Sequence, residues 1–386
     1  MRVPFFSRAP KTFAIADVGA GGSAVGFVQV PRSGPARIVA THRSFSPVEE
    51  RTAEGAVTAL GTTFSESAAS ALAQYSKGGG KGSPEAVYVV VHAPWAESHS
   101  FSNEQHFEKD TKITADMIGT LAKSALAQAG DIPRDQILEA SVVHVELNGY
   151  PVTNPVGRMA QQVKVAVLLS TMQKPYRDAL EHAVQAAFPS TPLKLRSHAR
   201  ALVSLLRERH DEARNCVIVD VADEGTVFSV IRKNLLDGQA QIPAGTHALL
   251  TRIAPAGSRE ETLGLLSMLE KGTCSTAACD AITQALTAAE PEITKIFGEG
   301  LASLAAKRRL PNDAILVTHA DIAPWFSHFL SRIDFAQFTS TSQPLSVKIL
   351  TPDALKMSAE TAPGVTEDVP LSIVATLVHN ESGSAD

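Results

Sequence analysis

The feature of this sequence that most constrains its fold is a pattern that occurs twice. A strand leads to an aspartate and a turn, and a β-meander follows. The first copy starts at Phe13 and turns after Asp17, and the second starts at Cys216 and turns after Asp220. The spacing of about 200 residues is far longer than the roughly 20–50 residues of solenoid repeats. The duplication therefore predicts two related lobes.

Composition limits the classes of function. The chain has 386 residues, of which 44% are hydrophobic and 19% charged, as in globular proteins. A net charge of −5 and an aromatic share of 5% argue against binding to nucleic acid. The three cysteines, Cys216, Cys274 and Cys279, are too few for a disulfide framework and favour a reducing cytoplasm. No segment is apolar enough to predict a membrane span.

Hydrophobic periodicity predicts a mixed α/β chain. A Thr114 N-cap precedes a helix, and Asn148-Gly149 marks a tight turn. Strands are also predicted at 86–92, 143–147, 163–169, 314–318, 347–350 and 371–377, and helices at 52–75, 114–130, 174–188, 258–307 and 326–333.

Two glycine-rich stretches resemble phosphate loops. Residues 19–24 match G-x-G-x-x-A, but a Rossmann site needs a following helix and a later acidic residue, and neither occurs. Residues 78–83 carry Lys81, which is followed by Gly82 rather than Ser or Thr, so a surface loop is the better interpretation. Cys274 and Cys279 have no partner ligands at metal-site spacing.

Asp17 and Asp220 are the strongest candidate site residues. Each ends an apolar strand, where a lone carboxylate is costly unless it serves a purpose. A capped turn would explain either one alone. Two such aspartates at matching places in two lobes favour a ligand shared between the lobes.

The order of motifs resembles the actin-like ATPases, in particular their FtsA/PilM branch. Residues 147–157, which include Asn148-Gly149-Tyr150 and Asn154-Pro155, are similar to a stretch typical of FtsA. The other matching segments are residues 17–21 and 220–226 as the first and second phosphate loops, 242–245 as the step into the second lobe and 315–320 as the adenosine side.

The resemblance implies an α/β fold of two ribonuclease-H-like lobes with an inserted subdomain of the SHS2 type. The implied boundaries are 12–94 and 166–205 for the first lobe, 95–165 for the inserted partner-binding subdomain, 206–345 for the second lobe and 346–386 for C-terminal strands and a polar tail. ATP phosphates would lie against Gly19, Ala20, Gly21, Gly22 and Ser23, and against Thr226 and Gly245. Asp17 and Asp220 would hold Mg²⁺ through water.

Several positions depart from the family pattern. Ala222, Asp223 and Glu224 stand where the second phosphate loop has glycines, and side chains there block the approach of backbone amides to phosphate. Thr246 and the pair His319-Ala320 replace further glycines. We therefore expect weak or absent binding and hydrolysis of ATP. The alternatives are an active actin-like ATPase that binds ATP and Mg²⁺ between its lobes and, more remotely, a sugar-kinase-like enzyme.

The resemblance also implies a place in the cell and a class of partner. FtsA ends in a basic amphipathic helix that binds membrane, whereas this chain ends in an acidic, polar segment. Near the N-terminus, only the cluster of Phe5 and Phe6 with two arginines could touch lipid, and weakly. We expect a cytoplasmic scaffold for cell division or type IV pilus assembly, peripheral at the inner membrane. A cytoplasmic segment of a membrane protein, or another envelope-complex subunit, would recruit it, and self-association stays open.

Overall fold

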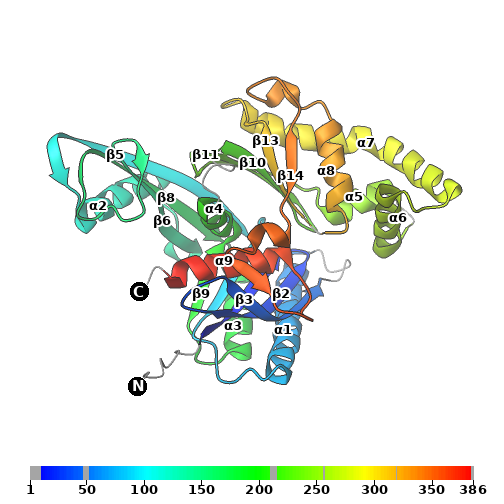
Figure 1. Ribbon diagram of the computed structural model, residues 1–386, viewed down its shortest axis with the longest axis horizontal. Coiled ribbons are helices and arrows are strands. Elements are labelled where there is room, and N and C mark those ends of the chain that lie inside the picture. The colour runs from blue at the N-terminus through cyan, green and yellow to red at the C-terminus, as the bar shows by residue number, and fades with distance from the viewer. Residues whose placement is uncertain (1–9, 47–51, 209–214, 255–256, 319, 384–386) are drawn as a thin grey trace, which may run out of the picture. The chain divides into compact units, whose positions relative to one another are not determined.

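The computed structural model describes residues 10–46, 52–208, 215–254, 257–318 and 320–383, shown in Figure 1. The chain divides into two compact units. Unit 1 comprises Met1–His92, Pro175–Arg196 and Thr351–Asp386, and unit 2 comprises Ala93–Lys174 and Ser197–Leu350. The N-terminal cluster around Phe5 lies outside the described residues, as does His319.

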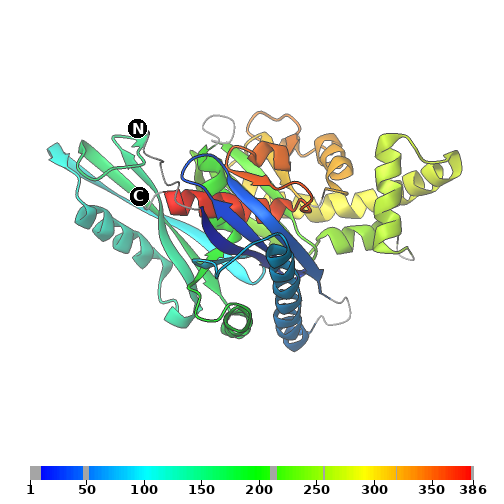
Figure 2. The ribbon, with the colours of Figure 1, turned by 60° about the horizontal axis from the view of Figure 1, so that its bottom comes forward.

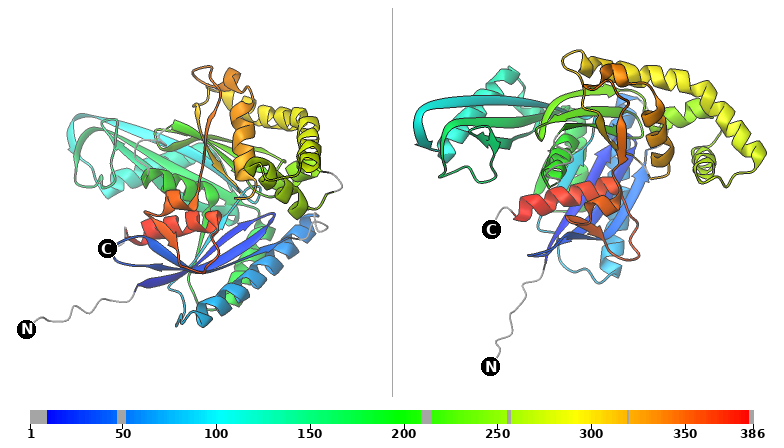
Figure 3. Two further views of the ribbon diagram at one scale, coloured as in Figure 1. Left: turned by 45° about the vertical axis from the view of Figure 1, so that its right-hand side comes forward. Right: turned by 45° about the horizontal axis from the view of Figure 1, so that its top comes forward.

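Unit 1 is built on a six-stranded sheet in the order β15-β3-β2-β1-β4-β9. Its strands are β1 (Lys11–Gly19), β2 (Gly22–Val30), β3 (Ala36–Phe45), β4 (Val87–Val91), β9 (Leu193–Ser197) and β15 (Ala359–Thr361). The helices α1 (Ala53–Lys77) and α3 (Lys174–Ala187) lie on one face and α9 (Val369–Gly383) on the other (Figures 1 and 3). Because both faces are covered, the central strands β1 and β4 are buried as continuous and mainly apolar runs rather than alternating.

Unit 2 contains a five-stranded sheet in the order β12-β11-β10-β13-β14. Its strands are β10 (Asn215–Val221), β11 (Thr226–Arg232), β12 (Leu235–Ile242), β13 (Asp313–Val317) and β14 (Ser346–Ile349). The associated helices are α4 (His198–Glu208), α5 (Thr246–Ile253), α6 (Arg259–Lys271), α7 (Thr276–Ala305) and α8 (Ala323–Arg332). Phe228, Phe297 and Phe326 form the aromatic centre of its core.

The two sheets repeat one topology, which confirms the predicted duplicated fold. In each, three antiparallel strands are followed by a fourth that pairs parallel with the first. The two aspartates occupy the same place in this pattern. Their cross-strand neighbours are Ala24 and Val90 for Asp17, and Val227 and Val317 for Asp220.

A third sheet, in the order β5-β8-β6-β7, lies within unit 2. It consists of β5 (Ala96–Lys112), β6 (Ile137–Leu147), β7 (Tyr150–Pro151) and β8 (Met159–Met172), with α2 (Ala115–Leu126) packed on it (Figure 2). The predicted helix is confirmed: the Thr114 hydroxyl accepts from the Met117 amide at 3.2 Å, and Leu121 is buried against the sheet. Asn148 and Gly149, with φ of 51° and 81°, form the predicted turn.

The prediction of a strand at residues 371–377 was wrong, because these residues form part of the helix α9. The helix is N-capped by Asp368, whose Oδ1 accepts from the Leu371 amide at 2.9 Å. Leu371, Ile373, Val374, Ala375, Leu377 and Val378 are all fully buried. A short apolar run of this kind has no helical period to distinguish it from a buried strand. The predicted polar tail likewise contributes residues 381–383 to α9.

One feature of the cysteines was not predicted from the sequence. Cys274 and Cys279 are joined by a disulfide, because the turn between α6 and α7 brings their Cα atoms to 5.6 Å, within bridging range. Cys216 is buried in β10. Its burial, and to a smaller extent the charge of Asp313, raises its pKa to about 12. Within the described part of the chain, no helix is both long and apolar enough to cross a membrane.

Candidate functional site

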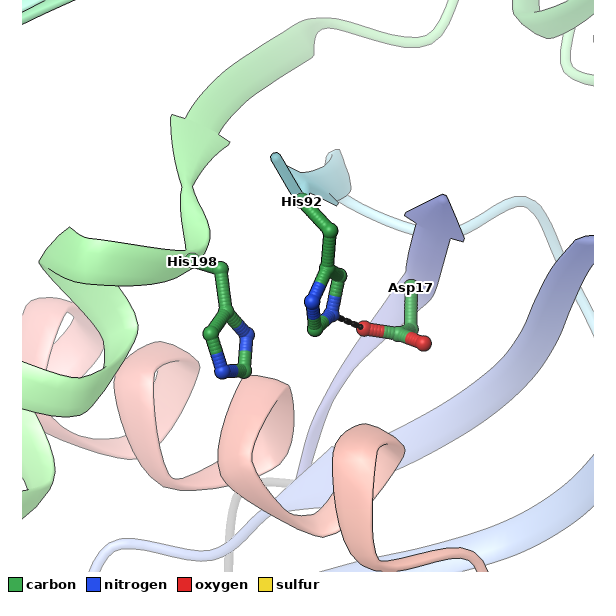
Figure 4. A group of neighbouring side chains, drawn as sticks. All are labelled: Asp17, His92 and His198. Atoms are coloured by element: carbon green, nitrogen blue, oxygen red, sulfur yellow. Dashed lines mark hydrogen bonds and ion pairs between the residues drawn. The ribbon is translucent and has the colours of Figure 1, made fainter. Parts of the chain in front are cut away.

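Asp17, at the end of β1, has both carboxylate oxygens engaged within unit 1. Its Oδ1 lies 2.5 Å from Nε2 of His92, the residue directly after β4 (Figure 4). Its Oδ2 accepts a hydrogen bond from Nη2 of Arg43 at 3.0 Å. Asp17 is only 3% exposed. The arginine, on β3, compensates for the cost of burying the carboxylate charge.

Arg43 joins Asp17 to the start of α9. Its Nε donates to Asp368 Oδ2 at 2.8 Å, and its Nη2 donates to Asp368 Oδ1 at 2.9 Å. Burial alone would lower the pKa of Arg43, but the charges of Asp368 and Asp17 raise it, and the net shift is upward. The guanidinium is therefore a permanent cation shared by two carboxylates.

The predicted first phosphate loop is a tight hairpin. Only Ala20 and Gly21 lie in the turn, since Gly19 and Gly22 already pair as the last residues of β1 and β2. Gly22 has φ of 144°, and a Cβ there would lie 2.2 Å from the carbonyl oxygen of Ser44, so only glycine fits. The hydroxyl of Ser23 bonds to Thr63 of α1 at 3.0 Å and is fully buried. Ser23 thus faces a helix of its own unit.

Asp220 in unit 2 is the counterpart of Asp17. Its Oδ2 lies 3.2 Å from Nε2 of His198, the first residue of α4, and both side chains are buried. A histidine therefore contacts the strand-end aspartate in each unit. The hydroxyl of Thr226 donates to the carbonyl oxygen of Ala244 at 2.6 Å, which ties it to the backbone.

Within the predicted second phosphate loop, residues 220–226, the turn at residues 222–225 is hydrogen-bonded to the start of α5. The amide of Thr246 donates to the Ala222 carbonyl at 2.8 Å, and the next amide of α5 donates to Asp223 at 3.0 Å. A helix N-terminus could hold an anion with these amides. Here the loop carbonyls accept them. Gly245 permits this approach, because a Cβ would lie 2.4 Å from three loop backbone atoms.

Asp223 also has a cationic partner. Its Oδ1 lies 2.7 Å from Nη2 of Arg259 at the start of α6. The loop therefore presents a paired carboxylate where the family pattern has a glycine. Ala320, the described half of the adenosine-side pair, follows β13 in the turn before α8.

The sequence pattern located the aspartates but not their partners. Of these, His92 could have been found, because it ends a predicted strand and parallel neighbours end at the same edge of a sheet. Arg43, Arg259, Asp368 and His198 carry no comparable pattern. Their roles depend on tertiary contacts between separate elements.

The residues around Asp17 do not fit the hydrated Mg²⁺ that the resemblance implies. Mg²⁺ needs near-octahedral oxygen ligands and usually keeps several waters. Both oxygens of Asp17 already accept from nitrogen donors. A magnesium ion would have to displace a partly buried, charge-paired arginine.

Comparisons with known proteins bear on the fold. No protein-family model matches the sequence, and no curated protein matches it. A chain of the solved PilM–PilN type IV pilus biogenesis complex superposes with a TM-score of 0.57 at 14% identity, over 97% of this chain and 98% of that one. This chain has an actin-like ATPase fold.

Two further solved structures are similar at a lower TM-score of 0.46. One is a protein of actin-like ATPase fold from Bacteroides thetaiotaomicron, at 8% identity over 97% of this chain and 99% of that one. The other is the ethanolamine utilization protein EutJ from Carboxydothermus hydrogenoformans, at 12% identity over 96% and 91%.

Proposed function

We propose that this actin-like chain is a PilM-like scaffold at the inner face of a bacterial envelope, with weak or no hydrolysis of ATP. The observation that carries the proposal is the engagement of both Asp17 oxygens by Arg43 and His92. The likeness to the chain of the PilM–PilN complex supports it, since it extends over nearly the full length of both chains.

Charge and geometry at the predicted loops oppose the binding of nucleotide. Breaking a buried ion pair by removing one partner costs about 3–5 kcal/mol. A cation that displaced Arg43 from Asp17 would therefore bind more weakly, because its binding must offset this cost. In unit 2, Asp223 is paired with Arg259, Glu224 adds a further carboxylate to the loop, and the first amides of α5 already donate to carbonyl oxygens of that loop. A phosphate group would meet repulsion and few available donors.

The similarity to the chain of the PilM–PilN complex also suggests what kind of protein this chain binds. The similar chain belongs to a complex with PilN. We infer that this chain likewise binds a cytoplasmic segment of a membrane protein, or another subunit of an envelope complex, and that this partner holds it peripherally at the inner membrane. Neighbouring genes discriminate pilus assembly from cell division: genes for a pilus platform support the first, and a gene for FtsZ supports the second.

An active ATPase is the second candidate, because Asp17 and Asp220 occupy the matching positions at which nucleotide-dependent relatives would hold Mg²⁺ through water. The two candidates differ in the response of the melting temperature to millimolar ATP with Mg²⁺. A ligand at 100 times its Kd stabilises the native state by about 2.7 kcal/mol. The scaffold proposal expects little or no shift in melting temperature and little or no release of phosphate. A shift of several degrees that Asp17→Asn abolishes would establish the ATPase instead.

A further inference from the structure

We propose that Arg43 is a built-in counter-ion that takes the place of a divalent cation at Asp17, so that unit 1 is stable without a metal ion at this carboxylate. The inference rests on the proposed function and supplies its physical cause: the chain has replaced an exchangeable metal ion with a covalently tethered cation.

The geometry of the guanidinium carries this inference. Its Nη2 donates both to Asp17 Oδ2, at 3.0 Å, and to Asp368 Oδ1, at 2.9 Å. Its Nε donates to Asp368 Oδ2 at 2.8 Å, which makes the contact with Asp368 bidentate. One planar cation therefore bridges the carboxylates at the end of β1 and before α9. A lysine ammonium lacks this fork and could not reproduce the arrangement.

Burial makes the positive charge necessary. The side chains of Asp17, Asp368 and Arg43 are only 5%, 13% and 17% exposed. Two carboxylates that share one cation this far from water repel each other strongly if the cation is removed. His92 contacts the other oxygen of Asp17 and leaves Oδ2 to Arg43. The guanidinium thus links the carboxylate near the end of β1 to the carboxylate before α9.

Removal of the arginine should create a cation site. In Arg43→Met, the oxygens of Asp17 and Asp368 would face the space that the guanidinium occupied. Carboxylate oxygens are the ligands that Mg²⁺, Ca²⁺ and Mn²⁺ prefer. The variant should therefore gain a dependence on divalent cations that the natural chain lacks.

The test uses MnCl₂ or MgCl₂ without nucleotide. For the natural chain, we expect no saturable heat with Mn²⁺ in calorimetry and no change in melting temperature. Arg43→Met should melt several degrees lower without metal and recover at least half of this loss in millimolar Mn²⁺. Adding Asp17→Asn to Arg43→Met should abolish the recovery.

Arg196→Met is the matched control. Arg196 also reaches α9, where its Nε and Nη2 both lie 3.0 Å from the Glu381 carboxylate, but it contacts a different carboxylate and is remote in sequence from Asp17. This variant should lose stability without any rescue by Mn²⁺. If Arg43→Met does not fold, Arg43→Gln takes its place in the same titration.

Two results would overturn the proposal. One is saturable Mn²⁺ or Mg²⁺ binding by the natural chain that Asp17→Asn removes. The other is an Arg43 variant whose stability does not respond to metal, or responds no more than Arg196→Met. Neither result requires nucleotide. The scaffold function fails separately, if the natural chain binds ATP.

Discussion

At Gly245, the backbone of unit 2 leaves no room for a side chain. A Cβ at this position would lie 2.4 Å from the carbonyl oxygens of Ala222 and Asp223 and from the amide nitrogen of Gly225. All three are backbone atoms, which cannot move aside as the end of a flexible side chain can. The glycine therefore allows the loop to close over the start of α5.

We expect Gly245→Ala to lower the free energy of unfolding by about 2 kcal/mol or more, since it forces the loop away from α5. Gly264→Ala is the control, because no atom lies within 4 Å of a Cβ there and the position is inside α6. Alanine in a helix interior should be neutral or stabilising by up to about 1 kcal/mol. Urea unfolding of both variants measures the difference, and equal effects would contradict this account.

His379 on α9 gives unit 1 a dependence on pH. Burial lowers the pKa of His379, and its Nδ1 is buried without a hydrogen-bond partner among the described residues. The folded state therefore favours the neutral imidazole. Below the ordinary histidine pKa of about 6.5, the unfolded chain binds more protons at His379 than the folded chain does. The free energy of unfolding therefore decreases as the pH falls through this range.

We expect His379→Gln to reduce the loss of stability between about pH 7.5 and pH 5.5. Melting curves of both proteins across this range provide the measurement, and the difference between them isolates this histidine from the others. If the two proteins differ in melting temperature by the same amount at every pH, His379 does not contribute to the pH dependence of stability.

At the scale of elements, α4 is held by a buried carboxylate of the third sheet. Glu139 on β6 accepts from both the amide and the hydroxyl of Ser197 at 2.8 Å. Ser197 precedes α4, and its hydroxyl also accepts from the Arg200 amide at 3.2 Å, as an N-cap does. The next residue is His198, which contacts Asp220. Glu139 thus fixes the helix that places this histidine.

We expect Glu139→Ala to lower the free energy of unfolding by about 2–3 kcal/mol, because it leaves buried donors of Ser197 without their charged acceptor. Glu97→Ala on β5, another strand of the same sheet, is the control, since Glu97 is exposed and should change stability by less than about 0.5 kcal/mol. Hydrogen exchange at the first amides of α4 should also be faster in Glu139→Ala. Unchanged exchange would mean that the carboxylate does not hold the helix.

At the scale of the whole molecule, two features oppose direct membrane binding. The net charge is −5, and anionic lipids repel a negative protein. The C-terminal helix α9 has its apolar residues buried against the unit 1 sheet. It cannot present them to lipid without leaving that sheet.

We therefore expect the purified chain to stay in the supernatant when it is sedimented with anionic liposomes at physiological salt. Arg196→Met, which breaks the ion pair between Arg196 of β9 and Glu381 of α9, serves as a control for loosening of the helix. Pelleting of most of the protein without a partner, unchanged by deletion of residues 1–10, would refute recruitment by a partner.

The sequence by itself determined the duplicated architecture. Strand, aspartate, turn and meander leave a local pattern of apolar runs and turn residues, and the pattern occurs twice. The same local information located Asp17, Asp220, the Thr114 cap and the Asn148-Gly149 turn. It did not distinguish the buried helix α9 from a strand, since a run that is apolar on every side shows no period.

Only the tertiary structure decided the chemistry at the aspartates. Arg43 reaches Asp17 from β3, and Asp368 meets the same guanidinium from a position 325 residues further along the chain than Arg43. No spacing in the sequence records such contacts, because they depend on which strands pair and which helix covers the sheet. Whether a buried carboxylate is available to a metal depends on what lies beside it in space, and here an arginine of the same unit lies there.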